Sequence, residues 1–252
     1  MSEFDGFARY YDADYSDVTD DIAFYQELAR RCDDPIIELM CGSGRLLLPL
    51  ARAGHRLTGV DSSPTMLALA RAKLADAGLS ERVTLIEGDI RASAPAGTFG
   101  LAIIGLNSFM HLTTTADQLA ALSHIHSALR TGGLLVLDLF NPDLRTLADA
   151  VGQLVLEKRF LLADGTAVHK FVSQQTDTAA QLSHITIIYD ELDAEGQVRR
   201  SALPFTMRWL YHYELEHLLA RAGFELTALY GSYDLDAYSG DSELMLAVAR
   251  RI

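Results

Sequence analysis

Three carboxylates stand at comparable places in the first third of the sequence. Glu38, Asp61 and Asp89 each lie at the end of a short apolar run. Such runs are typical of buried parallel strands, whose carboxyl ends meet at one edge of a sheet. At that edge Asp61 can accept hydrogen bonds from both hydroxyls of a ribose, and Glu38 suits an ammonium group rather than a pyrophosphate. Asp89 follows Gly88, a pair that is also common in ordinary turns. The pattern predicts a site for an adenosine-type ligand that carries a positive charge.

A glycine-rich turn follows the first of these carboxylates. It reads Cys41-Gly42-Ser43-Gly44, and its small residues let the backbone turn tightly and a ligand approach closely. A dinucleotide site would need a further glycine in the helix after Gly44, and a P-loop would need Gly-Lys-Ser/Thr; neither pattern is present. The spacing from Gly44 to Asp61 also fits the adenosine part of NAD, so a dehydrogenase remains the alternative at this point.

A histidine follows the fourth apolar run, at the same predicted edge. The run from Gly100 to Leu106 continues into Asn107-Ser108-Phe109-Met110-His111. An imidazole has a pKa near neutrality, so His111 could take a proton from an ammonium or a hydroxyl group. A histidine on a loop is more often only a polar surface group, and both interpretations stay open on the residues alone.

The segment from Glu38 to Gly44, Glu-Leu-Met-Cys-Gly-Ser-Gly, resembles motif I of class I S-adenosylmethionine (SAM) dependent methyltransferases. That family usually has a glycine where this chain has Met40. The resemblance implies SAM as the methyl donor and S-adenosylhomocysteine as the product. It also assigns the acids at three successive strand ends to the binding of one ligand, SAM, and this disfavours a dehydrogenase.

The resemblance implies roles for individual residues. Asp89 accepts from the adenine amine and the Ile90 amide donates to the ring, while the Leu106 carbonyl accepts from the SAM ammonium. Periodicity alone would place Met66 in the core, but the family often sets a methionine against adenine. The full set expected to bind SAM is Tyr11, Glu38, Met40, Gly42, Ser43, Gly44, Asp61, Ser62, Met66, Asp89, Ile90 and Leu106.

The segment around His111 resembles that of amino-sugar N-methyltransferases, in which a matching histidine lies beside the substrate. His111 and Tyr15 are therefore expected to be catalytic, and Asn107, Trp209 and Tyr211 to bind the substrate. Trp209 and Tyr211 belong to an alternating aromatic stretch that begins at residue 205 and is expected to be extended as far as residue 213. Packing in the core is the alternative role for most of this stretch.

Alternating strand and helix patterns position these residues up to about residue 142. They predict an α/β fold with a doubly wound, Rossmann-like sheet, which the family completes to seven strands with an antiparallel C-terminal hairpin. We expect residues 1–142 and 211–252 to form the SAM-binding domain, with residues 1–34 as an arm and helix over the cofactor.

The pattern changes to period two between residues 153 and 210, with hairpin signals at Asp164-Gly165 and Glu195-Gly196. These features predict an antiparallel β insertion of about four strands, assigned to residues 143–210. By resemblance, the insertion is a substrate lid, and it is also a candidate contact for a homodimer.

Composition limits the partners. The chain has 252 residues, a net charge of −13, two cysteines, and no cluster of lysine and arginine larger than a pair. An acidic surface repels a phosphate backbone, so we expect no nucleic-acid partner. Neither a signal peptide nor a membrane span is evident, and no metal-ligand spacing occurs. We therefore expect a cytoplasmic enzyme without a metal.

The function predicted from the sequence is methyl transfer from SAM to a small-molecule acceptor, most readily at an amine nitrogen. A small-molecule O-methyltransferase and a SAM-binding protein without turnover are the alternatives.

Overall fold

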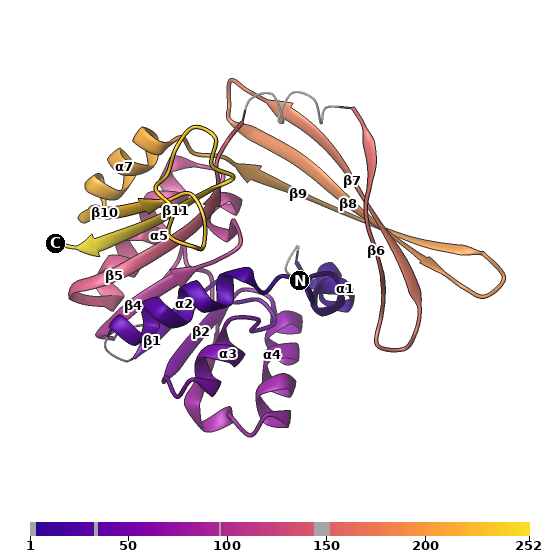
Figure 1. Cartoon of the computed structure of the whole chain (residues 1–252), viewed down its shortest axis with the longest axis horizontal. Helices are drawn as coiled ribbons and strands as arrows, with labels where there is room; N and C mark the ends of the chain where they lie inside the picture. The colour runs from indigo at the N-terminus through magenta and orange to yellow at the C-terminus, as the bar shows by residue number, and fades with distance from the viewer. Residues whose placement is uncertain (1–3, 33–34, 96, 144–151) are drawn as a thin grey trace.

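Seven strands form the central sheet of the protein, in the order β10-β11-β5-β4-β1-β2-β3 (Figure 1). The computed structural model describes residues 4–32, 35–95, 97–143 and 152–252. Strands β1 to β5 pair in parallel, whereas β11 is antiparallel to both β5 and β10. The expected Rossmann-like sheet is confirmed. Its strands are β1 (Ile36–Leu39), β2 (Leu57–Asp61), β3 (Val83–Glu87), β4 (Phe99–Ile104), β5 (Leu129–Phe140), β10 (Phe224–Tyr230) and β11 (Leu244–Arg251).

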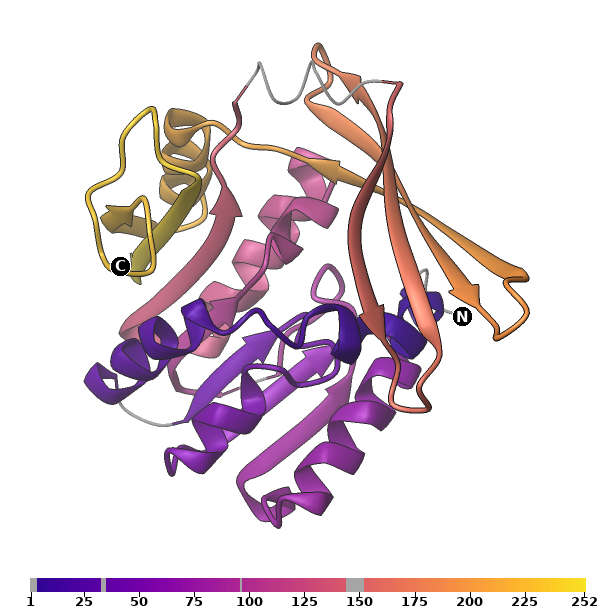
Figure 2. The same cartoon turned by 45° about the vertical axis from the view of Figure 1, so that its right-hand side comes forward.

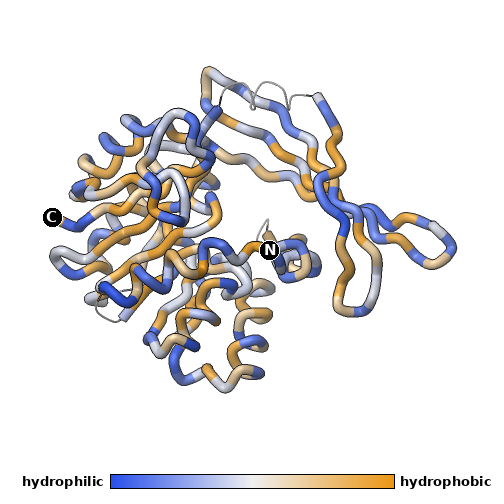
Figure 3. The backbone as a smooth tube through the Cα atoms, viewed as in Figure 1, coloured by the Kyte–Doolittle hydropathy of each residue, from blue (hydrophilic) through white to orange (hydrophobic). Residues whose placement is uncertain are grey.

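Helices cover both faces of this sheet, because the buried parallel strands are apolar on both sides. On one face, Ile37 and Leu39 of β1 pack in a cluster with helices α5 (Thr115–Ala128) and α7 (His212–Arg221). On the other face, Ile36 packs with α2 (Asp20–Arg31), α3 (Leu47–Arg52) and α4 (Pro64–Asp76). The hydrophobic residues of Figure 3 accordingly concentrate along the central strands.

A second sheet stands apart from the first and is antiparallel throughout, in the order β6-β7-β8-β9. Its long strands project beside the N-terminal helix in Figure 2. They are β6 (Leu154–Leu161), β7 (Ala167–Asp177), β8 (Leu182–Leu192) and β9 (Val198–Arg208). The predicted four-stranded insertion is confirmed as a sheet. Its predicted first residue, 143, is followed directly by residues 144–151, which lie outside the described part of the chain.

The N-terminal arm lies between the two sheets. It comprises the 3₁₀ helix η1 (Asp5–Phe7) and the helix α1 (Ala8–Asp14). Phe7 and Tyr10 pack in a third hydrophobic cluster with Tyr189 of β8 and Met66 of α4. This arm therefore touches both the cofactor-side helix α4 and the second sheet.

The alternating stretch of aromatic residues is shorter than the sequence predicts. Strand β9 ends at Arg208, and α7 begins at His212, so alternation does not extend to Tyr213. Tyr211 becomes the residue that caps α7, because Glu214 accepts a hydrogen bond from its amide. Two further 3₁₀ helices, η2 (Ser80–Arg82) and η3 (Ser108–His111), precede β3 and follow β4. No described helix is long and apolar enough to span a membrane.

Candidate active site

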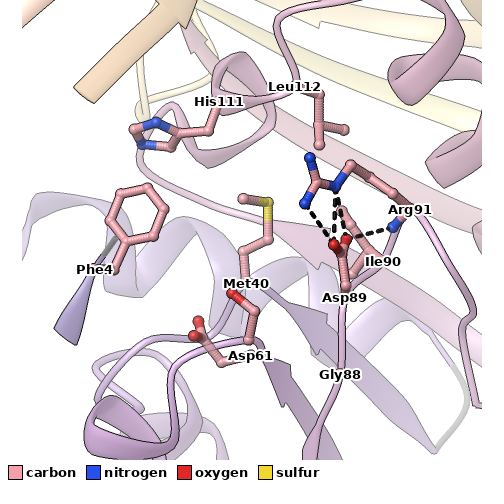
Figure 4. A pocket seen from close by; sticks show the side chains of 10 residues that line it. Phe4, Met40, Asp61, Gly88, Asp89, Ile90, Arg91, His111 and Leu112 are labelled. Atoms are coloured by element: carbon pink, nitrogen blue, oxygen red, sulfur yellow. Dashed lines mark hydrogen bonds and ion pairs between the residues drawn. The ribbon is translucent and has the colours of Figure 1, made fainter. Parts of the chain in front are cut away.

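The glycine-rich turn leaves β1 with a sharply bent backbone. Positive φ angles occur at Met40 (56°), Gly42 (54°) and Gly44 (76°). A side chain at Gly44 would lie 3.2 Å from the Cβ atom of Ala70 in α4, so helix and turn approach too closely for a larger residue. Met40 adopts this left-handed conformation without being glycine, which costs about 1–2 kcal/mol. Its side chain lies in the cavity that the turn borders (Figure 4).

Glu38 is buried beneath this turn and carries an unused acceptor. Its Oε2 atom has no hydrogen-bond partner among the described residues, and the residue is 5% exposed. Burial raises the pKa of the Glu38 carboxyl to about 8, although the positive charge of Arg45 opposes the shift. A buried, unpartnered carboxylate oxygen is unfavourable unless a donor arrives. The free acceptor suits a donor such as an ammonium group, but Glu38 lines neither cavity of this site.

Asp61, at the end of β2, is fixed by backbone donors. The amides of Gly42 and Ser63 each donate to one of its carboxylate oxygens, both at 2.8 Å. A carboxylate oxygen has more than one acceptor site, so these contacts orient the group without exhausting it. Asp61 and its neighbour Ser62 both line the larger cavity.

Asp89, beyond the end of β3, forms an ion pair that the sequence analysis did not anticipate. Both of its oxygens accept from the Arg91 guanidinium, at distances of 2.6–3.0 Å, and this pair lowers the pKa of Asp89. Figure 4 shows the pair at the rim of the cavity, with Ile90 beside it. Asp89 is thus preoriented, and any further donor would have to share it with Arg91.

Two adjoining cavities bring most of the predicted residues together. One has a volume of about 570 Å³ and the other about 120 Å³. Both are lined by Phe4, Met40, Asp61 and His111. The larger cavity adds Ser62, Asp89 and Ile90, and the smaller adds Tyr11, Tyr15, Gly42, Met66 and Leu106.

The arm supplies two tyrosines to the smaller cavity. The rings of Tyr11 and Tyr15 stack at 4.6 Å, and Tyr11 lies over Gly42. The Lys170 ammonium of β7 lies 5.5 Å from the Tyr15 ring, a distance suited to a cation–π contact. Lys170 in turn pairs with the buried carboxylate of Asp14 at 2.9 Å.

His111, at the end of η3, lies between two aromatic rings. The ring centroids of Phe4 and Phe205 are 4.8 and 5.4 Å from that of His111. Burial lowers the pKa of His111 to about 4, and a backbone hydrogen bond with Thr206 only partly opposes this effect. The Nδ1 atom is buried without a partner among the described residues.

Leu106 and Asn107 form the turn between β4 and η3. Both have positive φ angles, 48° and 61°. Leu106 lines the smaller cavity, whereas the Asn107 side chain accepts from the Phe140 amide at 2.5 Å. The predicted substrate contact of Asn107 therefore competes with a backbone bond that its side chain already makes.

The hydroxyl of Ser43 holds the arm to the turn. It donates to Asp12 at 2.5 Å, and Lys73 of α4 donates to both residues at 2.7 and 2.9 Å. Ser43 is completely buried. Its side chain thus has a structural contact, and only its backbone remains for the predicted cofactor role.

Trp209 and Tyr211 lie away from the residues just described. Trp209 is 1% exposed and packs in the core cluster with α5 and α7, while Tyr211 is 39% exposed at the start of α7. Neither lines the two cavities in the described part of the chain. Phe205, four residues earlier on β9, lines the smaller one.

Sequence reasoning missed Phe4, Arg91 and Phe205 at this site. Phe205 began the alternating stretch, but only the fold reveals which of its members faces the cavity. Arg91 stands two residues after Asp89, and that spacing gave no signal that the two would pair.

Residues 36–133 match the model of a methyltransferase domain. The cypemycin N-terminal methyltransferase of a Streptomyces species is 27% identical over 224 residues, which cover 86% of this chain and 82% of that protein. The chain spans 38% to 52% of the length of seven other curated relatives that it matches.

Solved structures share the complete fold. The CcbJ methyltransferase from Streptomyces caelestis has a TM-score of 0.77 at 24% identity, covering 92% of this chain and 94% of that one. SAM-bound CalS10, an amino pentose methyltransferase from Micromonospora echinaspora, has a TM-score of 0.69 at 22% identity, covering 92% and 89%.

The fold, the glycine turn and the matching domain model define a class of enzyme. Residues 36–133 carry a methyltransferase domain, and the similar proteins support a SAM-dependent methyltransferase. The dehydrogenase alternative is thereby set aside.

Proposed function

We propose that this enzyme methylates the amine nitrogen of a small molecule. The observation that carries this proposal is the placement of His111, which lines both cavities and whose Nδ1 atom has no partner among the described residues. Two similar proteins are described as methylating an N-terminus and as acting on an amino pentose. Their names favour nitrogen over oxygen.

In this proposal, each part of SAM is bound by different predicted residues. Glu38 and the Leu106 carbonyl hold its ammonium, and Asp61 holds the ribose. Asp89, Ile90 and Met66 hold the adenine, while Tyr11 closes over the methionine end. Once bound, SAM supplies a sulfonium-activated methyl group, so the protein has mainly to align the acceptor and exclude water.

His111 and Tyr15 receive the acceptor in this proposal. An imidazole with a pKa of about 4 is neutral at physiological pH, so Nδ1 can accept a hydrogen bond from an uncharged amine. The amine lone pair then forms the new N–C bond as the S–C bond breaks. The product is a methylated ammonium, which leaves the site and loses its proton to solvent, so His111 orients the amine by its hydrogen bond without holding the proton.

The second sheet, the proposed lid, would close the acceptor side. Tyr189 and Ile187 of β8 and Phe205 of β9 line the smaller cavity together with arm residues Phe4 and Phe7. Apolar walls of this kind exclude water from a reaction in which charge moves from sulfur to nitrogen.

A screen of amines and alcohols with SAM, read by mass spectrometry, tests the proposal. We expect a mass increase of one methyl group on an amine and matching formation of S-adenosylhomocysteine. Methylation confined to hydroxyl acceptors would establish the O-methyltransferase instead. SAM binding without turnover on any acceptor would leave only a binding protein.

A further inference from the structure

The buried carboxylate of Asp138, on β5, collects donors from three distant parts of the chain. Its Oδ2 atom accepts from the hydroxyl of Tyr25 on α2 at 3.0 Å and from that of Tyr233, between β10 and β11, at 2.9 Å. The third donor is the backbone amide of Leu106, at 3.2 Å. Asp138 is 1% exposed. A buried charge of this kind is retained only where its partners compensate its desolvation.

The Leu106 amide belongs to the turn with two consecutive positive φ angles, at Leu106 and Asn107. Residues with side chains disfavour this conformation, and leucine does so strongly. Asp138 holds both residues of the turn. Its side chain accepts from the Leu106 amide, and its backbone carbonyl accepts from the Asn107 amide at 2.9 Å.

The turn borders the proposed cofactor site. Leu106 lines the smaller cavity with Gly42 and Asp61, so a change in its backbone would alter the surface that meets SAM. Asp138 itself lines neither of the two cavities. It can act on the cofactor only through the turn.

We propose that Asp138 is a positioning residue that holds the Leu106–Asn107 turn in its SAM-binding shape. The apparent affinity for SAM then equals the intrinsic affinity multiplied by the fraction of molecules with the turn in this shape. The inference rests on SAM binding at the glycine turn and is independent of the acceptor.

Calorimetric titration with SAM tests the role of Asp138 without requiring turnover. Asp138→Ala should raise the dissociation constant about tenfold or more, the effect of losing a hydrogen bond to a charged group. Leu106→Gly should restore the affinity in the double variant, because glycine adopts positive φ freely and keeps the carbonyl. We expect the double variant to bind SAM within about threefold of Leu106→Gly alone.

Tyr233→Phe is the matched control. It removes one donor to Asp138 but leaves the Leu106 bond, so it should lower the melting temperature while SAM affinity stays within about twofold. Three results would overturn the proposal: unchanged affinity in Asp138→Ala, no recovery with Leu106→Gly, or an equal loss of affinity in Tyr233→Phe.

If Asp138→Ala does not fold, Asp138→Asn takes its place. Asparagine keeps one oxygen for the Leu106 amide but loses the charge, so SAM affinity should fall about threefold. Leu106→Gly should again remove the loss. An asparagine variant with wild-type affinity would contradict the assignment.

Discussion

At the scale of single residues, the Asp61 carboxylate binds the backbone of the glycine turn and also faces the cavity. Its oxygens accept from the amides of Gly42 and Ser63, which leaves acceptor capacity toward the cavity. Asp61→Ala should raise the SAM dissociation constant about tenfold or more, since bonds to a charged group contribute roughly 1.5–3 kcal/mol. Calorimetry measures the change. Asp76→Ala, at the far end of α4, is a control that should keep wild-type affinity.

Glu38 predicts that SAM binding releases a proton. Its pKa is about 8 in the ligand-free protein, so the carboxyl is largely protonated at pH 7. An ammonium beside it would favour the ionised form and drive the proton off. Titrations at pH 7 in buffers of different ionisation enthalpy should show the release, and Glu38→Gln should lack it. Equal proton counts for the two proteins would refute the contact.

The raised pKa of Glu38 also acts on stability. An acid that ionises near pH 4.3 when unfolded and near 8 when folded binds its proton more tightly in the folded state. The protein without SAM should therefore lose stability as the pH rises through this window, and Glu38→Gln should not show this loss.

His111 predicts an unusual pH profile. Because its pKa is lowered to about 4, the rate should follow the ionisation of the acceptor amine, with no inflection from the histidine between pH 5 and 8. His111→Ala should lower kcat by about tenfold, the effect of losing one orienting hydrogen bond, with SAM binding intact. The fold loss should stay the same at high pH, because both proteins use the uncharged amine. A variant with full activity at pH 7 would make His111 a packing residue.

His111 also shows where sequence reasoning stops at this scale. The position of His111 after the fourth strand could be predicted, because strand ends follow from local apolar runs. The lowered pKa of its imidazole could not be predicted, since Phe4 and Phe205, which bury the ring, are distant in the sequence and meet it only in the fold. Asp138 interrupts an apolar strand, which was a signal that the sequence analysis left unused.

At the scale of elements, α1 is joined to the second sheet by buried charges. Lys170 of β7 pairs with the buried Asp14 and with the half-exposed Glu157. Asp14 also accepts from the hydroxyl of Tyr189, and Arg9 donates twice to Glu191. The arm and the second sheet therefore behave as one wall of the smaller cavity.

Lys170→Met should separate the arm from this sheet. Lys158 stays 3.9 Å from the Asp14 carboxylate and Tyr189 still donates to it, so losing the buried partner should destabilise the protein by about 1–3 kcal/mol. Denaturant unfolding measures the loss, and the acceptor KM should rise with it. Glu157→Gln removes the exposed partner of the same lysine and should cost about 1 kcal/mol or less. Equal losses of unfolding free energy in the two variants would contradict the stronger contribution of the buried Lys170–Asp14 pair.

The elements themselves were largely predictable. Both predicted hairpin turns, Asp164-Gly165 and Glu195-Gly196, lie between neighbouring strands of the second sheet, as their turn residues indicate. The aromatic stretch after Phe205 was not, because alternation continues in the sequence past Arg208 while the chain turns into α7. Trp209 consequently lies in the core and remains a prediction as a substrate contact.

At the scale of the whole molecule, the second sheet has exposed apolar residues on an edge strand. Leu154, Val155, Leu156 and Leu161 of β6 are 39% to 65% exposed. An unpaired strand edge with such residues is a template for pairing with another chain. We propose that β6 is the contact in a homodimer.

Leu161→Lys should disrupt this dimer. A charge on an edge strand opposes edge-to-edge pairing, so light scattering should show a shift from dimer to monomer. Val198→Lys places the same charge on β9, at the opposite edge of the sheet, and should leave the dimer unchanged. A monomeric wild type would contradict the proposal.

Strand β11 comes after every other described strand in the sequence, yet it lies inside the central sheet, between β10 and β5. The second sheet pairs only strands that are neighbours in sequence, so it can form while translation continues. Until β11 has been translated, the parallel part of the central sheet has an unpaired edge at β5. Tyr233, whose hydroxyl donates to Asp138, precedes β11 in the sequence and is therefore also translated late. The central sheet can therefore close only after the nascent chain has been extended through β11.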